Sequence, residues 1–251
     1  MNNKGQIAIF IIVGVLIFVS LTVFFLVRDT EVTLPTGTEF GPERFMGSCV
    51  RQSLRETTDM MLSQGGFVNP KNAVVSNGTT VTYLCKNINY YESCIAQHPA
   101  YLSELQEELR AQLAEDIPSC LDSLKTELER RNYEVQLEDY DIKVALKPEI
   151  VDVSIPIELT LTKNDVVQRI SQLDTSLRIP LYNLGRVANE LVSQEARFCY
   201  SEYVGYMLLY PSYDIRVKTL SDTTKGYSVT HLPTDKTLQF AIRGCVIPAG
   251  I

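Results

Sequence analysis

The chain has 251 residues, of which 45% are hydrophobic and 21% charged, and its net charge is −7. Lys4 and Arg28 are the only charged residues before Asp29, so the part from Asp29 onward carries −9. This acidic balance argues against nucleic acid as a partner and against electrostatic adhesion to anionic lipid. The length allows one large domain or two small ones after the N-terminal segment.

The first predicted element is an apolar run from Ile7 to Val27, which contains no charged residue. As a helix, residues 6–27 would be about 33 Å long, enough to cross a hydrocarbon core of about 30 Å. A secretory signal peptide would have a shorter apolar region and small residues at a cleavage site, and neither is present here. We therefore expect a retained helix at 6–28 that contacts membrane lipid or other copies of itself.

The residues before this run are Lys4-Gly5-Gln6. A polar leader that ends in this way resembles the class III signal peptide of archaeal type IV pilin-like proteins. The resemblance implies that a prepilin peptidase cuts between Gly5 and Gln6, which makes residues 1–5 a leader and leaves the helix attached. It covers only about the first 27 residues, and Phe10 stands where many pilins carry Glu. The resemblance therefore supports processing more than it supports a role as a major pilin.

Six cysteines follow the apolar run, without any Cys-x-x-Cys pair. An even, widely spaced set of this kind is typical of three disulfides in an oxidising compartment, which places the C-terminal part outside the cell. Six cysteines allow 15 pairings. One predicted bond closes a ten-residue loop, a second joins two cysteines that flank apolar helix stripes, and the remaining two form the third. The alternative for the second pair is two free buried thiols. The predicted pairs are Cys85–Cys94, Cys49–Cys120 and Cys199–Cys245.

After a Pro- and Gly-containing stalk at 29–41, the sequence predicts a helix from Glu43 to Gln64, between Pro42 and Gly65-Gly66. Strand-like runs on both sides of Asn77-Gly78 predict a β-hairpin. Asn77 also begins a glycosylation sequon, Asn-Gly-Thr, which is compatible with an exposed turn outside the cell.

The clearest element beyond the anchor is an amphipathic helix of about 30 residues. Its leucine and isoleucine residues recur at spacings of three and four, which indicates one buried stripe. The stripe stays in register across Pro118, so we expect a kink and not a break. The stripe consists of Leu102, Leu105, Leu109, Leu113, Ile117, Leu121, Leu124 and Leu128.

A period of two then predicts three or four antiparallel strands between Tyr133 and Thr162, and another strand at 166–179. Helices are predicted at 180–195 and 200–210, followed by strands near 215–220, 227–231 and 238–243. The predicted class is α+β: an N-terminal transmembrane or pilin-type helix, then a disulfide-braced extracellular domain at 42–251 in which helices pack on an antiparallel sheet.

Four tyrosines fall at intervals of three or four near the second of these helices. One interpretation is a core seam packed against the sheet. The other is an aromatic platform for a glycan or a partner surface, since tyrosine combines an apolar ring with a polar tip. The residues of this possible binding surface are Tyr200, Tyr203, Tyr206 and Tyr210.

Catalytic signatures are missing from the sequence, which has no phosphate-binding glycine loop, no nucleophile elbow and no zinc-protease helix. With only His98 and His231, histidine-based acid–base chemistry has little support. Cys85, Cys94 and His98 have donor types that suit zinc, but a disulfide is the simpler expectation for the two thiols. The acidic pairs in Glu104–Glu129 suit a solvated helix face better than a glycosidase site. We predict no enzyme, metal or cofactor.

The sequence thus predicts a pilin-like or membrane-anchored cell-surface protein with a structural or adhesive role. The alternative is a non-polymerising, membrane-anchored binding module for a solute, a glycan or a partner cell.

Overall fold

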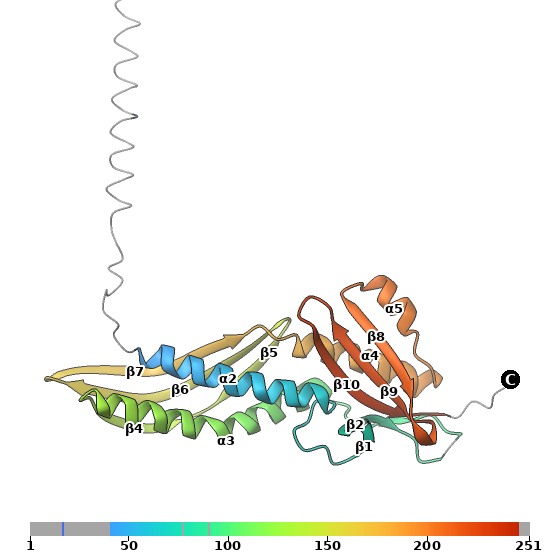
Figure 1. The fold of residues 1–251 in the computed structure, drawn as a ribbon, viewed down its shortest axis with the longest axis horizontal. Coiled ribbons are helices and arrows are strands. Elements are labelled where there is room, and N and C mark those ends of the chain that lie inside the picture. Colours follow the sequence, from blue (N-terminus) through green and yellow to red (C-terminus); the bar gives the residue numbers. More distant parts are fainter. Residues whose placement is uncertain (1–16, 18–40, 77, 90, 246–251) are drawn as a thin grey trace, which may run out of the picture. The chain divides into compact units, whose positions relative to one another are not determined.

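The computed structural model describes residue 17 and residues 41–76, 78–89 and 91–245. The chain divides into two units, residues 1–41 and 42–251, and the elements named below all belong to the second. Four helices and two sheets are present in this described part, which confirms the α+β class (Figure 1). The helices are α2 (Pro42–Ser63), α3 (Tyr101–Arg130), α4 (Leu181–Phe198) and α5 (Tyr203–Leu209).

The cleavage site at Gly5-Gln6 lies outside the described residues, as do Asn77 and all of the predicted anchor except residue 17. Among the described residues, no helix has the length and apolarity needed to cross a membrane. The hairpin on both sides of Asn77 is confirmed, because Ser76 pairs with Thr79. Gly78 has φ +81°, a conformation that glycine adopts at low cost in such turns.

The first sheet has the strand order β1-β2-β10-β9-β8, with the short strand β3 beside β2. The pairing of β10 with β2 is parallel, whereas the sequence predicted an antiparallel sheet throughout. This pair joins the end of the chain to a strand that lies more than 150 residues earlier, a contact that no local pattern encodes. The strands are β1 (Ala73–Ser76), β2 (Thr79–Lys86), β3 (Ile95–Ala96), β8 (Tyr213–Thr219), β9 (Lys225–His231) and β10 (Lys236–Arg243).

The second sheet is built around one long strand, β6 (Ile150–Lys163), which pairs with β7 (Val166–Leu177) along one edge. Along its other edge β6 pairs first with β5 (Lys143–Lys147) and then with β4 (Glu134–Tyr140). Three strands thus fill residues 134–163, within the three or four that were predicted, and β6 continues through Pro156. Pro156 lies opposite the interval between β4 and β5 and beside a register shift against β7, where the ladder is already interrupted.

The core of the second sheet lies under α2 and α3, which run side by side along it (Figure 1). Every second residue of β6 from Val151 to Leu161 is buried on this face. Helix α3 is 30 residues long and continues without a break through Pro118. Its apolar stripe is buried from Leu105 to Leu128, as predicted. Helix α4 covers the first sheet and also contacts α3, so it links the two sheets through one core.

The three disulfides have the predicted pairing. Cys49–Cys120 joins α2 to α3, Cys85–Cys94 closes the short loop after β2, and Cys199–Cys245 joins the end of α4 to the segment after β10. The interpretation of Cys49 and Cys120 as free thiols is thus wrong. Three disulfides indicate an oxidising compartment.

Candidate functional site

The tyrosines that the sequence singled out lie around α5, which is shorter than the predicted helix. Tyr200 precedes the helix and Tyr210 follows it. No residue of α5 is buried, so the core-seam interpretation is wrong. The helix lies on the outside of the domain, in contact with β8 (Figure 1).

The turn between α4 and α5 fixes the position of the short helix. Cys199 ends α4 in the left-handed conformation with φ 57°, and its disulfide to Cys245 holds it there. Glu202 then caps α5, because its Oε1 accepts a hydrogen bond from Gly205 N at 3.2 Å. The main-chain N of Glu202 donates to Gln194 Oε1 on α4 at 2.8 Å. These contacts hold α5 beside the exposed side of α4.

Between the two helices lies a groove of about 700 Å³. An adjoining hollow of about 400 Å³ shares Glu190, Gln194 and Glu202 with it and extends it toward the end of α4. We call the two together the α4–α5 groove. Its further lining residues are Arg186, Gly205, Tyr206, Leu208, Leu209 and Tyr210 in the first part, and Ser193, Arg197, Phe198 and Tyr200 in the second.

Aromatic rings form one side of this groove. The ring centroids of Tyr206 and Tyr210 are 4.7 Å apart, and Tyr206 contacts Tyr213 edge to face at 6.2 Å. Tyr213 in turn lies 5.5 Å from the ring of His231. Burial raises the pKa of Tyr206 and of Tyr213, so both phenols stay protonated at neutral pH and can donate a hydrogen bond.

Hydrophobic side chains in and beside the groove are unusually exposed. Leu208 and Leu209 are 81% and 77% exposed, and Phe198 is 64% exposed. Tyr200, Tyr210 and Val204 are each about half exposed. A cluster of this size on an otherwise acidic surface is typical of an interaction site.

The charged groups of the groove balance one another, because Arg186 and Arg197 offset Glu190 and Glu202. Glu202 Oε2 accepts a hydrogen bond from the Tyr200 hydroxyl at 3.1 Å, which raises the pKa of Tyr200. Glu190 Oε1 accepts from Gln194 Nε2 at 2.8 Å. Arg186 is exposed and forms no ion pair with any carboxylate in the described part of the chain.

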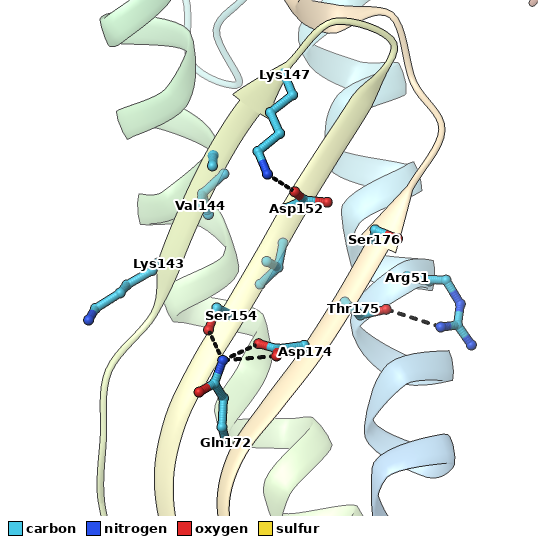
Figure 2. Close-up of a pocket in the computed structure, with 12 residues that line it drawn as sticks. Arg51, Lys143, Val144, Lys147, Asp152, Ser154, Gln172, Asp174, Thr175 and Ser176 are labelled. Carbon is cyan, nitrogen blue, oxygen red and sulfur yellow. Dashed lines mark hydrogen bonds and ion pairs between the residues drawn. The ribbon is translucent and has the colours of Figure 1, made fainter.

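A second hollow, of about 640 Å³, lies on the open face of the second sheet (Figure 2). Its polar side chains bond to each other: Lys147 pairs with Asp152 at 2.7 Å, and Gln172 donates to Asp174 at 2.8 Å. The hydrogen bonds from Gln172 and Ser154 lower the pKa of Asp174. None of its lining residues is aromatic. The hollow has the character of a solvated sheet face, so the α4–α5 groove is the better candidate.

A buried polar cluster lies between α4 and β9. The carboxylate of Glu195, which is 1% exposed, accepts hydrogen bonds from Lys225 Nζ at 2.8 Å on both oxygens. It also accepts from the Tyr227 hydroxyl, which lies 2.9 Å from Ser201 Oγ. The pKa of Tyr227 is raised, chiefly by burial and to a smaller extent by the hydrogen bond to Glu195. The carboxylate and the ring are both enclosed, so this cluster ties α4 to β9 and does not face a substrate.

The zinc hypothesis is wrong, because Cys85 and Cys94 are bonded to each other. His98 instead pairs with Glu104 at 2.5 Å, and its ring contacts that of Phe67 at a tilt, with 4.5 Å between the ring centroids. This pairing uses one ring nitrogen of His98 within a packed aromatic contact, and no nucleophile is part of it.

The structure brings together three of the four predicted tyrosines, since Tyr200, Tyr206 and Tyr210 line the groove and Tyr203 does not. Sequence reasoning missed Arg186 and the leucine pair at 208–209. The signal for the leucines was their position directly before Tyr210 in a helix too short to bury both. No protein-family profile, no curated protein and no solved structure matches this chain.

Proposed function

We propose that the protein is a membrane-anchored cell-surface protein with an adhesive or structural role, and that it binds another protein through the α4–α5 groove. The observation that carries this proposal is the exposed cluster around Leu208 and Leu209, beside hydrogen-bonding groups of balanced charge. Apolar and aromatic residues at the centre with polar residues around them are the usual composition of protein–protein interfaces.

A protein partner fits this surface better than a small solute does. Solute sites enclose most of their ligand, whereas the side chains that dominate here project outward, with Leu208 81% exposed. The ring pair of Tyr206 and Tyr210 favours a glycan as the second candidate, because sugar rings stack on such side chains. A stacked sugar leaves the leucines without a role, so the protein partner is preferred.

The membrane anchor in this proposal is the apolar run from Ile7 to Val27. The disulfides support an external position for the domain, because they persist in oxidising compartments. The leader at residues 1–5, which ends in Lys4-Gly5 before Gln6, supports delivery by the class III route.

The mature protein should begin at Gln6. Cleavage after Gly5 removes the basic leader and leaves the apolar helix at the new N-terminus, where it remains in the membrane. Mass spectrometry of the protein extracted from membranes should find this start, and a Gly5→Leu variant should keep Met1. An intact Met1 in the unaltered protein, or a start beyond Val27, would contradict class III processing.

Adhesion should depend on the leucines of the groove. Fluorescent phosphatidylcholine vesicles carrying the full chain should bind intact source cells, as counted by flow cytometry. Leu208→Ser with Leu209→Ser should reduce binding at least tenfold, because the apolar centre of the interface is lost. Val166→Ser is the matched control, since Val166 is 70% exposed on β7, outside the groove.

Treatment of the cells separates the two candidate partners. If binding is abolished by protease and resists periodate oxidation of sugars, the partner is a protein. Loss of binding after periodate alone would favour the glycan. Unchanged binding by the leucine variant would contradict the assignment of the groove as the contact surface.

A further inference from the structure

Arg186 and Glu190 occupy successive turns of the exposed side of α4 and yet form no ion pair with each other. A basic residue four positions before an acidic one is the less favourable order for such a pair on a helix. Glu190 is bonded to Gln194 instead. The groove therefore carries one exposed positive and one exposed negative group, about 6 Å apart along the helix axis. Neither has an ion-pair partner in the described part of the chain, so each can pair with an opposite charge on another molecule.

The net charge of the chain limits which surface two copies can share. The part of each copy from Asp29 onward carries −9, so two copies repel each other at long range. A contact between them is favourable only where the local charge is balanced and complementary. The α4–α5 groove meets this condition, since two arginines and two glutamates line it.

We propose that the partner bound by the α4–α5 groove is a second copy of this chain, related by a two-fold axis that passes between Arg186 and Glu190. In this antiparallel arrangement of the two α4 helices, Arg186 of each copy faces Glu190 of the other. A two-fold contact is self-complementary, so the same pair forms twice. This inference rests on the proposed function, because it names the partner of the same surface.

The apolar side chains fit the same arrangement. Leu208 and Leu209 belong to the wall of the groove opposite Arg186 and Glu190. When two grooves face each other, the leucines of one copy cover the rings of Tyr206 and Tyr210 in the other. Each copy then removes from water two leucine side chains that are 81% and 77% exposed in the single chain. A lipid surface would bury the leucines but would leave the carboxylates of Glu190 and Glu202 in an apolar environment without a cation to pair with.

Association between proteins on two different vesicles tests this contact separately from any association of anchors within one membrane. The full chain is labelled with a donor dye in one set of neutral phosphatidylcholine vesicles and with an acceptor dye in another. Energy transfer between the two sets then reports only contacts between domains on different bilayers. We expect transfer with the unaltered protein, and at least tenfold weaker association of either Arg186→Glu or Glu190→Arg with itself, because like charges then face each other twice.

Mixing the two variants is the decisive step. Vesicles with Arg186→Glu and vesicles with Glu190→Arg should associate to within about threefold of the unaltered protein, because both cross pairs are again of opposite charge. A misfolded variant could not be rescued by its partner. Failure of the mixture to associate, when both variants show an unaltered circular dichroism spectrum, would overturn the two-fold arrangement.

Two other outcomes distinguish this inference from the proposed function. If the two sets of vesicles show no energy transfer but still bind source cells through Leu208 and Leu209, the partner is a different protein and the inference alone is wrong. If they bind neither each other nor cells, both are wrong. Binding to protein-free phosphatidylcholine vesicles would overturn the second copy in favour of a lipid surface.

Discussion

Replacing Lys225 with methionine should lower the free energy of unfolding by about 3 kcal/mol or more. Lys225 is the only cation within ion-pair distance of the Glu195 carboxylate in the described part of the chain, and that carboxylate is almost fully buried. Without the ammonium group the buried charge keeps only its bond from Tyr227. Urea unfolding of residues 42–251, followed by circular dichroism, measures this loss.

Lys236→Met is the matched control for this prediction. Lys236 pairs with Asp59, but their side chains are 30% and 48% exposed, so water replaces the lost partner. The control should cost less than about 1 kcal/mol. Glu195→Gln combined with Lys225→Met should recover part of the stability, because the amide leaves no buried charge. Equal losses in Lys225→Met and Lys236→Met would mean that the buried carboxylate is hydrated.

Elements with a strong burial period could be predicted from the sequence. The stripe of α3 repeats every three or four residues from Leu105 to Leu128, and all of it is buried. Along β6, every second residue from Val151 to Leu161 is buried, which is the period of a strand. In such segments each side chain's environment follows from its position in the helix or strand, so local sequence contains the needed information.

The contacts that the sequence did not reveal join distant segments. The parallel pairing of β2 with β10 depends on how segments far apart in the sequence pack together in the folded domain. The contact of Glu195 with Lys225 depends on it in the same way. Neither residue of that ion pair differs, in its sequence neighbourhood, from a surface glutamate or lysine. Burial alone gives the pair its energetic weight, and burial is a property of the assembled fold.

Of the residues that line the groove, the sequence pointed only to the tyrosines, and it left their role open. Tyrosines at intervals of three and four fit a buried seam and an exposed platform equally well. The left-handed turn at Cys199 and the cap at Glu202 decide between them, because they place α5 outside the core. Arg186 gave no signal at all, since its place in the groove and its lack of an ion pair among the described residues are visible only in the structure.

Removing the disulfide between α2 and α3 should have the largest effect of any change to the cysteines. Cys49 and Cys120 are 71 positions apart, and closing a loop of that length stabilises a fold by about 4 kcal/mol in the chain-entropy model. The double variant Cys49→Ala with Cys120→Ala should lose that amount, as measured by urea unfolding of residues 42–251. In the single variant Cys49→Ala, the freed Cys120 thiol should react with a thiol reagent only in denaturant, because Cys120 is 1% exposed.

The bond between Cys85 and Cys94 provides the internal control, since its cysteines are nine positions apart. The same model gives about 3 kcal/mol for this short loop, so the corresponding double variant should be destabilised less. The difference between the two variants tests whether the long bond acts by restricting the unfolded chain. If both variants lose the same stability, the contribution of the bond between α2 and α3 does not depend on the length of the loop that it closes, and restriction of the unfolded chain is not its mechanism.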